Sequence, residues 1–572
     1  MALWRKRWEL APTAPQAFRQ RFPSLDPLVQ QILYNRGLTE QHDVTAFMEG
    51  SIPADSPFQM RDVEPAVALI RRAVQRDELI AVYGDYDADG ITALTLLVQT
   101  LQALGARVYA YIPDREDEGY GLNPDAIRAV RDQGAKLLIT VDCGIRSLKE
   151  VALARELGMH VIITDHHHLG EALPGADAVL NPRRPDNGYP FSDFAGVGVA
   201  FKLAQGLLRV NGRSTLPTTQ EELTEEDLLD LFALGTVADM VPLLGENHTL
   251  VRRGLEVINR ARRPGLASLM EVLNVTPGEV KASTIGYVLA PRLNAAGRLG
   301  DPLKAFHLLN APDMAQALPI ATELESLNQQ RQDLTRYVED EARAMVVESG
   351  IDRPLLFAVG SDFPSGIVGL AAGRLAEEFY RPAIVVERGK EFSKASARSI
   401  PEFHITKAFD EIGDLLVQYG GHAAAAGFTV RTERLPEVQR RLLEIAEKQL
   451  VDVELTPSLF VDAEVPLYTL SWDDYHALQR LAPFGYGNQR PLLVSRGLYV
   501  RHARAVGREG RHLKLYVEDR GGKVWDVIAF RQGQWARRLP DLIDLAYYLE
   551  RNEWNGRVTL QLNAQDIHPS AR

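Results

Sequence analysis

Short apolar runs alternate with helix-like segments from about residue 62 onward, and this alternation limits the possible folds more than any other feature of the chain. Five of these runs are LIAVYG (79–84), VYAYIP (108–113), KLLITVDCG (136–144), HVIITDHH (160–167) and ADAVLNP (176–182). Segments between them, such as ITALTLLVQTLQALGA (91–106), have the spacing of amphipathic helices. Strands that are apolar throughout and alternate with helices are typical of a parallel sheet covered on both faces. We therefore predict an α/β fold.

The rest of the chain changes pattern twice. Residues 318–345 carry apolar side chains three or four positions apart, which predicts a long helix that connects two domains. The strand–helix alternation restarts over 354–450, and after about 455 alternating strands with an Asn555–Gly556 hairpin signal predict a small β-barrel or sandwich. We predict an N-terminal segment packed on other domains (1–50), a parallel-sheet domain (51–315), a connecting helix (316–350), a smaller α/β domain (351–452) and a β-barrel domain (453–572).

The composition is that of an ordinary globular protein. Of 572 residues, 45% are hydrophobic and 24% are charged, which is ordinary for globular domains. The net charge of −12 argues mildly, by itself, against a polyanionic partner. The single cysteine, Cys143, cannot form an intrachain disulfide, and we interpret it as buried packing in a protein of a reducing compartment. The opening MALWRKRWEL has no apolar run of a secretory signal, and no stretch of the chain is long and apolar enough to span a membrane, so we expect a cytoplasmic protein.

Acidic and histidine side chains follow three of the predicted strands. LIAVYG leads into Asp85, Asp87 and Asp89, KLLITV leads into Asp142, and HVIIT leads into the run Asp165-His166-His167-His168. In open α/β sheets the carboxyl ends of the parallel strands meet at one edge, where ligands bind. We therefore expect these three clusters to share one crevice, although they are far apart in the sequence.

Several carboxylates in one crevice repel each other unless a positive group lies among them, and a divalent ion is the usual compensation. Carboxylate oxygens with imidazole nitrogens suit Mn²⁺, Mg²⁺, Zn²⁺ or Fe²⁺, and two such ions would activate a water and stabilise a phosphoryl transition state. A lone Asp-x-Asp motif is usually a solvated turn, and a lone histidine run is usually a loop tip. The metal hypothesis therefore depends on all three clusters together. The run GVGVAF (196–201) loosely resembles a nucleotide-binding glycine loop, but helix packing is the favoured interpretation.

Further segments carry a family likeness. They are DYDADG (85–90), VDCG (141–144), Asp165-His166-His167, GTVADMVPL (235–243), PRLNAAGRL (291–299), GSDFPSGIVGLAAGRL (360–375), SARS (396–399), GGHAAAAGF (420–428), PFGYGN (483–488) and WNGRVTLQL (554–562). In these segments the chain resembles the DHH phosphoesterase superfamily, and within it the bacterial RecJ family, which degrades single-stranded DNA from the 5′ end. The resemblance implies a parallel-sheet DHH domain, a long connecting helix, a smaller α/β DHH-associated domain and a β-barrel OB-fold domain.

The resemblance also implies roles for the acidic and histidine residues. The family's metal ligands match Asp87, Asp89, Asp142, His166 and Asp239, and its neighbouring catalytic position matches His167. Asp85 stands where many relatives carry a histidine ligand, so we include it among the metal ligands. Asp165 opens the motif, and we expect it to orient a histidine without binding metal itself. Asp142, His166, His167 and His422 are the residues to which we assign catalysis.

The resemblance also implies roles for the basic residues. Arg115, Ser396 and Arg398 match a pocket for a terminal 5′-phosphate, for which the planar arginine fork is suited. Contacts to the DNA backbone near the scissile phosphate are expected from Arg292, Asn294, Arg298, Arg374, Gly421 and His422. For each arginine alone, a surface salt bridge is the alternative. In the barrel, the basic residues between Arg501 and Lys514, together with Tyr516, suit single-strand binding.

Three functions remain open at this point. The first is a metal-dependent exonuclease, with two Mn²⁺ or Mg²⁺ ions, that degrades single-stranded DNA 5′→3′ to mononucleotides in recombination and repair. The second is a DHH phosphoesterase that acts on oligoribonucleotides or cyclic dinucleotides, and the third is a non-catalytic relative of such enzymes. The domain that follows residue 455 favours the first over the second, and the retained ligands disfavour the third. We expect a monomer, with a helicase and a single-strand-binding protein as possible partners and no membrane.

Overall fold

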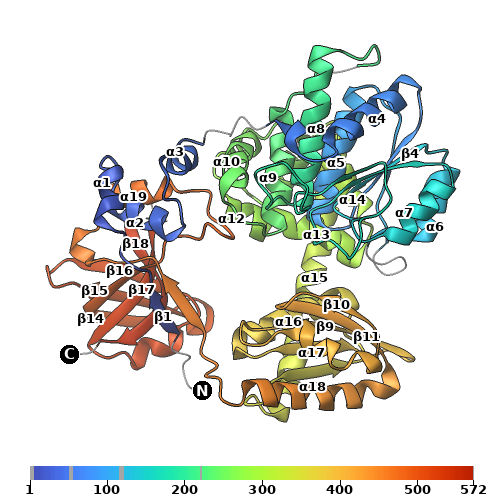
Figure 1. Cartoon of the computed structure of the whole chain (residues 1–572). Coiled ribbons are helices and arrows are strands. Elements are labelled where there is room, and N and C mark those ends of the chain that lie inside the picture. The colour runs from blue at the N-terminus through green and yellow to red at the C-terminus, as the bar shows by residue number, and fades with distance from the viewer. Residues whose placement is uncertain (1–5, 51–55, 115–120, 220–221, 555, 571–572) are drawn as a thin grey trace. The chain divides into compact units, whose positions relative to one another are not determined.

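The computed structural model describes residues 6–50, 56–114, 121–219, 222–554 and 556–570, and Figure 1 labels its elements. The chain divides into two units, each of which we describe by itself. The larger unit contains Leu10–Glu325 and Phe460–Arg572, and the smaller unit contains Met1–Glu9 and Ser326–Leu459. Among the described residues, no helix has both the length and the apolar character needed to cross a membrane.

The strand–helix repeats of the larger unit form a five-stranded parallel sheet, as predicted. Its order is β3 (Val108–Tyr111), β2 (Ile80–Tyr83), β4 (Leu137–Val141), β5 (His160–Thr164) and β6 (Ala178–Leu180). The chain starts at β2, moves to β3 on one side and then to β4 on the other. The carboxyl ends of β2 and β4 therefore form the topological switch point of the sheet, the place where open α/β folds bind their ligands.

Helix α5 (Ala88–Ala103) follows β2 and is buried on nearly all sides. The sequence suggested an amphipathic helix here, and the difference arises because α8 (Gly196–Arg213) and α9 (Leu229–Ala238) pack against it. In the sequence, α6 (Pro124–Asp132) lies between β3 and β4 and α7 (Leu148–Glu156) lies between β4 and β5, and α9 packs against α10 (Gly245–Asn259). These helices fix the loops at the strand ends from several directions.

A single long helix, α15 (Met314–Ser349), contains the boundary between the two units, after Glu325. The smaller unit holds a five-stranded mixed sheet in the order β10 (Leu416–Gly421), β11 (Ala425–Arg431), β9 (Phe392–Arg398), β8 (Ala383–Glu387) and β7 (Leu356–Gly360). Only β7 and β8 are parallel in this sheet. Helix α16 (Ser365–Phe379) packs on β8 and β9, and α17 (Ile405–Asp410) packs on α18 (Leu435–Leu450).

The C-terminal strands form a closed barrel in the larger unit. The strands β14 (Leu493–Val506), β15 (His512–Glu518), β16 (Val524–Ala529), β18 (Arg557–Pro569) and β17 (Leu542–Trp554) follow one another, and β17 pairs again with β14. The expected hairpin joins β17 to β18. Gly556 has a left-handed φ of 75° there, while Asn555 lies outside the described residues. Side chains of α1 (Gln16–Arg21), α2 (Pro27–Asn35) and α3 (Gln41–Glu49) join the core of this barrel.

Candidate active site

The backbone after β2 makes a tight turn, and this turn positions the aspartates of the loop. Asp87 is the N-cap of α5, and its Oδ1 accepts hydrogen bonds from the backbone N–H groups of Asp89 at 2.9 Å and Gly90 at 3.1 Å. A Cβ atom on Gly90 would lie 2.6 Å from the backbone oxygen of Asp85. Because no side chain fits there, glycine lets Asp85 fold back over the start of the helix.

The Asp89 carboxylate faces the first turn of α8. Gly196 N–H donates to its Oδ2 at 2.6 Å, and Val197 N–H donates to its Oδ1 at 2.8 Å. A Cβ on Gly196 would lie 2.5 Å from the Cβ of Asp142, so this glycine also lets the helix approach a second aspartate. A helix N-terminus stabilises a carboxylate through its unpaired N–H groups and its dipole. The GVGVAF run is therefore part of this site, although the sequence only indicated helix packing for it.

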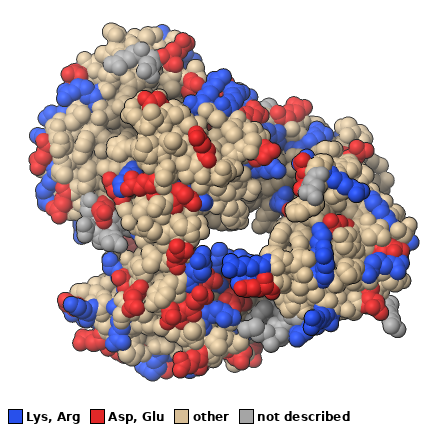
Figure 2. Space-filling model, turned by 180° about the vertical axis from the view of Figure 1, so that it is seen from behind, with Lys and Arg blue, Asp and Glu red and all other residues tan. Residues whose placement is uncertain are grey.

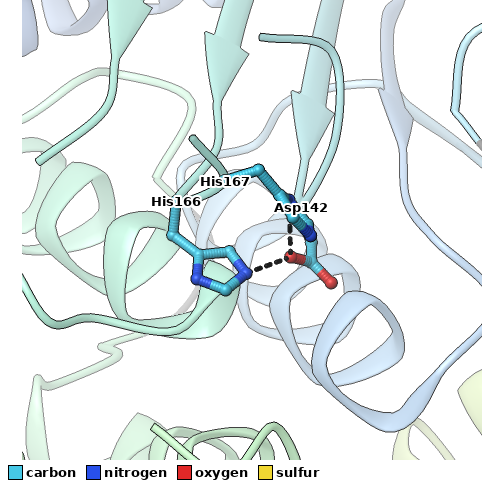
Figure 3. Close-up of side chains that lie close together, drawn as sticks. All are labelled: Asp142, His166 and His167. Carbon is cyan, nitrogen blue, oxygen red and sulfur yellow. Dashed lines mark ion pairs between the residues drawn. The ribbon is translucent and has the colours of Figure 1, made fainter. Parts of the chain in front are cut away.

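Asp142 and His166 meet at the switch point. Asp142 directly follows β4 and has a left-handed φ of 61°, a strained conformation for a residue other than glycine. The His166 Nε2 lies 3.1 Å from the Asp142 Oδ1, 3.7 Å from the Asp239 Oδ2 and 3.9 Å from the Asp89 Oδ2. Figure 3 shows both His166 and His167 turned toward the Asp142 carboxylate.

Asp165 orients His167, as the motif suggested. Its Oδ1 accepts hydrogen bonds from His167 Nδ1 at 2.8 Å and from His167 N–H at 3.0 Å, and its Oδ2 accepts one from Ile145 N–H at 2.9 Å. Burial by itself raises the pKa of Asp165, but the hydrogen bonds and charge of His167 bring this pKa below its ordinary value. Asp165 is thus an anion engaged with the protein, which suits a positioning role.

All six predicted metal ligands and His167 come together in three overlapping groups, in each of which the ligand atoms lie within 4.8 Å of one another. The groups are Asp85, Asp87 and Asp142; Asp89, His166 and Asp239; and Asp142, His166 and His167. Among the described residues, the buried His166 Nε2 and Asp239 Oδ2 have no hydrogen-bond partner. Oxygen-rich ligand sets with one or two imidazoles, and no thiolate, suit Mn²⁺ or Mg²⁺. The residues therefore fit two divalent ions, with Asp142 shared between the groups.

Comparisons with known proteins cover nearly the whole chain. Three family models match: "DHH family, N-terminal domain" over residues 79–236, "DHHA1 domain" over 352–449 and "RecJ OB domain" over 461–566. The single-stranded-DNA-specific exonuclease RecJ of Bacillus subtilis is 37% identical over 568 residues, which cover 98% of this chain and 70% of that protein. The RecJ of Escherichia coli is 34% identical, over 95% of this chain and 96% of that protein. The chain belongs to the RecJ family.

Solved structures of the RecJ family agree. The crystal structure of RecJ in complex with Mn²⁺ from Thermus thermophilus matches with a TM-score of 0.85 and 30% identity, over 99% of this chain and 80% of that one. The same protein in complex with Mg²⁺ matches with a TM-score of 0.79 and 29% identity. The predicted fold, including the OB-fold barrel, is thereby confirmed.

The acidic cluster has perturbed pKa values. Burial, followed by the neighbouring carboxylates, raises the pKa of Asp89 to about 7 and that of Asp239 to about 9, and raises the pKa of Asp142 well above its ordinary value. Burial and the charge of His167 lower the pKa of His166 to about 4. Without a cation, Asp239 therefore retains its proton at neutral pH and Asp89 is partly protonated.

We expect the metal-free protein to lose stability as the pH rises from about 6.5 to about 9. Because folding raises the pKa values of Asp89 and Asp239, the folded state holds more protons than the unfolded state in this range, and raising the pH favours unfolding. Thermal unfolding in a chelator at several pH values measures this, and added Mn²⁺ should remove most of the slope. A melting temperature that stays constant or rises over this range would contradict the expectation.

Three DNA-contact residues predicted from the RecJ resemblance lie on α13 (Ala290–Leu299), beside the aspartate loop. The Asn294 Oδ1 accepts a hydrogen bond from Ala88 N–H at 2.8 Å, so this side chain supports the loop between Asp87 and Asp89. Arg292 Nε lies 2.7 Å from the Glu325 Oε2, which is the salt bridge considered as its alternative. Arg298 stands in the last turn of the helix and is half-buried.

The other predicted DNA contacts lie in the smaller unit, apart from Arg115, which falls outside the described residues. Ser396 and Arg398 are neighbours on β9, where Arg398 Nη1 donates to Ser396 Oγ at 3.3 Å. Arg374 is half exposed and lies 3.5 Å from Glu377. Gly421 ends β10 with a φ of 141°, and the exposed His422 follows it. The sheet thus brings Ser396 and Arg398 together, and the roles of all these residues remain predictions.

Proposed function

We propose that the protein is a metal-dependent exonuclease that degrades single-stranded DNA 5′→3′ to mononucleotides in DNA recombination and repair. One observation carries this function: carboxylates and histidines that fit two divalent ions converge at the switch point of a DHH sheet. Membership in the RecJ family supports the substrate, because the relatives that match nearly the whole chain are named single-stranded-DNA-specific exonucleases. The release of mononucleotides and the 5′→3′ polarity are inferred from the motifs that the chain shares with that family.

The protein's own residues divide the chemical work. Asp85, Asp87 and Asp142 would hold one Mn²⁺ or Mg²⁺, and Asp89, His166, Asp239 and the shared Asp142 would hold the other. Two bound ions supply an acidified water and positive charge at the scissile phosphate. His167, whose ring Asp165 orients, is suited to proton transfer there, and His422 is proposed to stabilise charge on the leaving or non-bridging oxygens.

Contacts with the phosphates of the DNA are proposed for the arginines and for several neighbouring residues. Ser396, Arg398 and Arg115 would hold the terminal 5′-phosphate, and Arg292, Asn294, Arg298, Arg374, Gly421 and His422 would contact the backbone. The proposal includes the division of the chain into five parts, with boundaries at residues 50, 315, 350 and 452. A monomer in the bacterial cytoplasm, working with a helicase and a single-strand-binding protein, completes it.

A phosphoesterase of oligoribonucleotides or cyclic dinucleotides is not favoured. The match to the RecJ OB domain spans residues 461–566, and this barrel offers a surface for a longer strand. A small substrate would make no use of such a surface.

The test uses single-stranded DNA labelled at its 3′ end, with Mn²⁺ or Mg²⁺ present. The proposal requires progressive shortening of the labelled strand and unlabelled mononucleotide products. A matched duplex with blunt ends should resist digestion. Internal fragments of random length, or rapid loss of the 3′ label as a mononucleotide, would reject the proposed polarity and exonuclease action.

A further inference from the structure

The PFGYGN turn (483–488), which leads into the barrel, contacts the loop that follows Asp239. Both segments belong to the larger unit. Leu243 N–H donates a hydrogen bond to the backbone oxygen of Tyr486 at 2.7 Å. Asp239 itself closes α9, so only three residues separate this candidate metal ligand from the hydrogen-bonded Leu243.

Two glycines make this approach possible. A Cβ on Gly487 would lie 2.9 Å from the Cβ and 3.1 Å from the Cα of Pro242, and a Cβ on Gly485 would lie 2.7 Å from the Cδ1 of Leu243. The contact with the Pro242 Cα involves backbone, which cannot turn aside as a flexible side chain can. The turn and the loop are therefore packed so closely that a single added methyl group would displace the loop.

The turn is rigid enough to act as a support. Asn488 is fully buried, and its Nδ2 donates to the backbone oxygens of Leu481 at 2.8 Å and Pro483 at 2.7 Å. Gly485 N–H in turn donates to the Asn488 backbone oxygen at 2.9 Å. From the other side, α10 contacts the same segment, because Arg252 Nη2 donates to the Ala482 backbone oxygen at 2.8 Å.

The supported loop is short and strained. Met240, directly after Asp239, has a left-handed φ of 59°, which is uncommon for a residue other than glycine and persists only where surrounding contacts impose it. Asn247 of α10 holds the loop from a second direction, because its Nδ2 donates to the Pro242 backbone oxygen at 3.1 Å. The Asp239 carboxylate therefore depends on a backbone that the PFGYGN turn helps to hold.

We propose that the PFGYGN turn is a positioning element for Asp239, so that the segment leading into the barrel contributes to metal affinity. This inference rests on the proposed function, because it assumes that Asp239 is a metal ligand. Supporting contacts around metal ligands typically change metal affinity by about 10- to 100-fold when they are lost. The turn should act on the metal and not on the affinity for DNA.

The test compares Gly487→Ala with Gly522→Ala in the full chain. Both glycines have similar left-handed φ values, 73° and 78°, but a Cβ on Gly522 would meet nothing within 4 Å. Both variants therefore carry the same backbone strain, and only the first pushes on Pro242. Calorimetric titration of the metal-free proteins with Mn²⁺ should show binding about 10-fold weaker in Gly487→Ala and unchanged in Gly522→Ala.

A milder pair keeps the proposal testable if Gly487→Ala does not fold. Gly485→Ala adds a methyl group beside Leu243, whereas Gly212→Ala adds one in open space, and neither position has a left-handed φ. Mn²⁺ binding by Gly485→Ala should be weaker than by Gly212→Ala. Equal Mn²⁺ affinity within both pairs, or a change confined to the KM for single-stranded DNA, would overturn the positioning role while leaving the proposed function intact. A wild-type protein that binds no Mn²⁺ would instead refute both.

Discussion

Replacement of Asp142 by asparagine should lower kcat/KM on single-stranded DNA by at least about 1,000-fold, or roughly 4 kcal/mol of transition-state stabilisation. Asp142 belongs to two of the three ligand groups, and its Oδ1 lies 3.1 Å from His166 Nε2. An amide carries no negative charge, so it binds a divalent ion more weakly than a carboxylate does. Initial rates over a range of Mn²⁺ concentrations measure the effect, and excess Mn²⁺ should not restore the wild-type rate.

The same substitution should raise the melting temperature of the metal-free protein. Burial and the charges of Asp89, Asp87, Asp239 and Asp85 disfavour an anion at Asp142, so this carboxyl group must take up a proton when the metal-free protein folds. A neutral amide does not carry this cost. Asp452→Asn, at an exposed position of the smaller unit, is the matched control and should alter neither activity nor stability. Near-wild-type activity in Asp142→Asn would remove this residue from the metal centre.

The strand-end argument predicted most of the metal centre because it depends only on topology. Asp85, Asp142 and His166 follow different strands, yet a parallel sheet brings their positions to one edge whatever the intervening helices do. Asp239 could not be found in this way, because it ends a helix, and only the family likeness pointed to it. Gly196 was missed as a site residue because its role is a backbone N–H donated across more than a hundred positions to Asp89.

The side-chain partners of the basic residues could not be predicted from the sequence either. Arg292 has Glu325 beside it and Asn294 supports the aspartate loop, which no spacing rule indicates.

The net charge of the chain was a poor guide to whether the protein binds a polyanion. On the face drawn in Figure 2, lysine and arginine side chains gather in groups among acidic ones, so the total of −12 does not describe any one surface. Several of the acidic residues counted in that total lie in the metal centre and not on an outer face.

Arg398→Ala should reduce the preference of the enzyme for a 5′-phosphorylated end over a 5′-hydroxyl end by about 10- to 100-fold, because a hydrogen bond to a charged group contributes roughly 1.5–3 kcal/mol. Arg398 is half-buried, and burial lowers its pKa, yet no carboxylate among the described residues forms an ion pair with it. Arg292 and Arg374, by contrast, each have a glutamate partner. A half-buried guanidinium without an anion is suited to receive one from the substrate.

Helix α16 packs closely against the two polar groups proposed to bind the terminal phosphate. A Cβ on Gly369 of α16 would lie 2.9 Å from Ser396 Oγ and 3.3 Å from Arg398 Nη2, so a larger residue there would crowd both groups. Arg398→Lys should recover only part of the preference, because an ammonium lacks the planar fork. Arg353→Ala, at an exposed position of the same unit, is the control and should keep the full preference. Competition between phosphorylated and unphosphorylated strands measures the ratio, and an unchanged ratio in Arg398→Ala would place the terminal phosphate elsewhere.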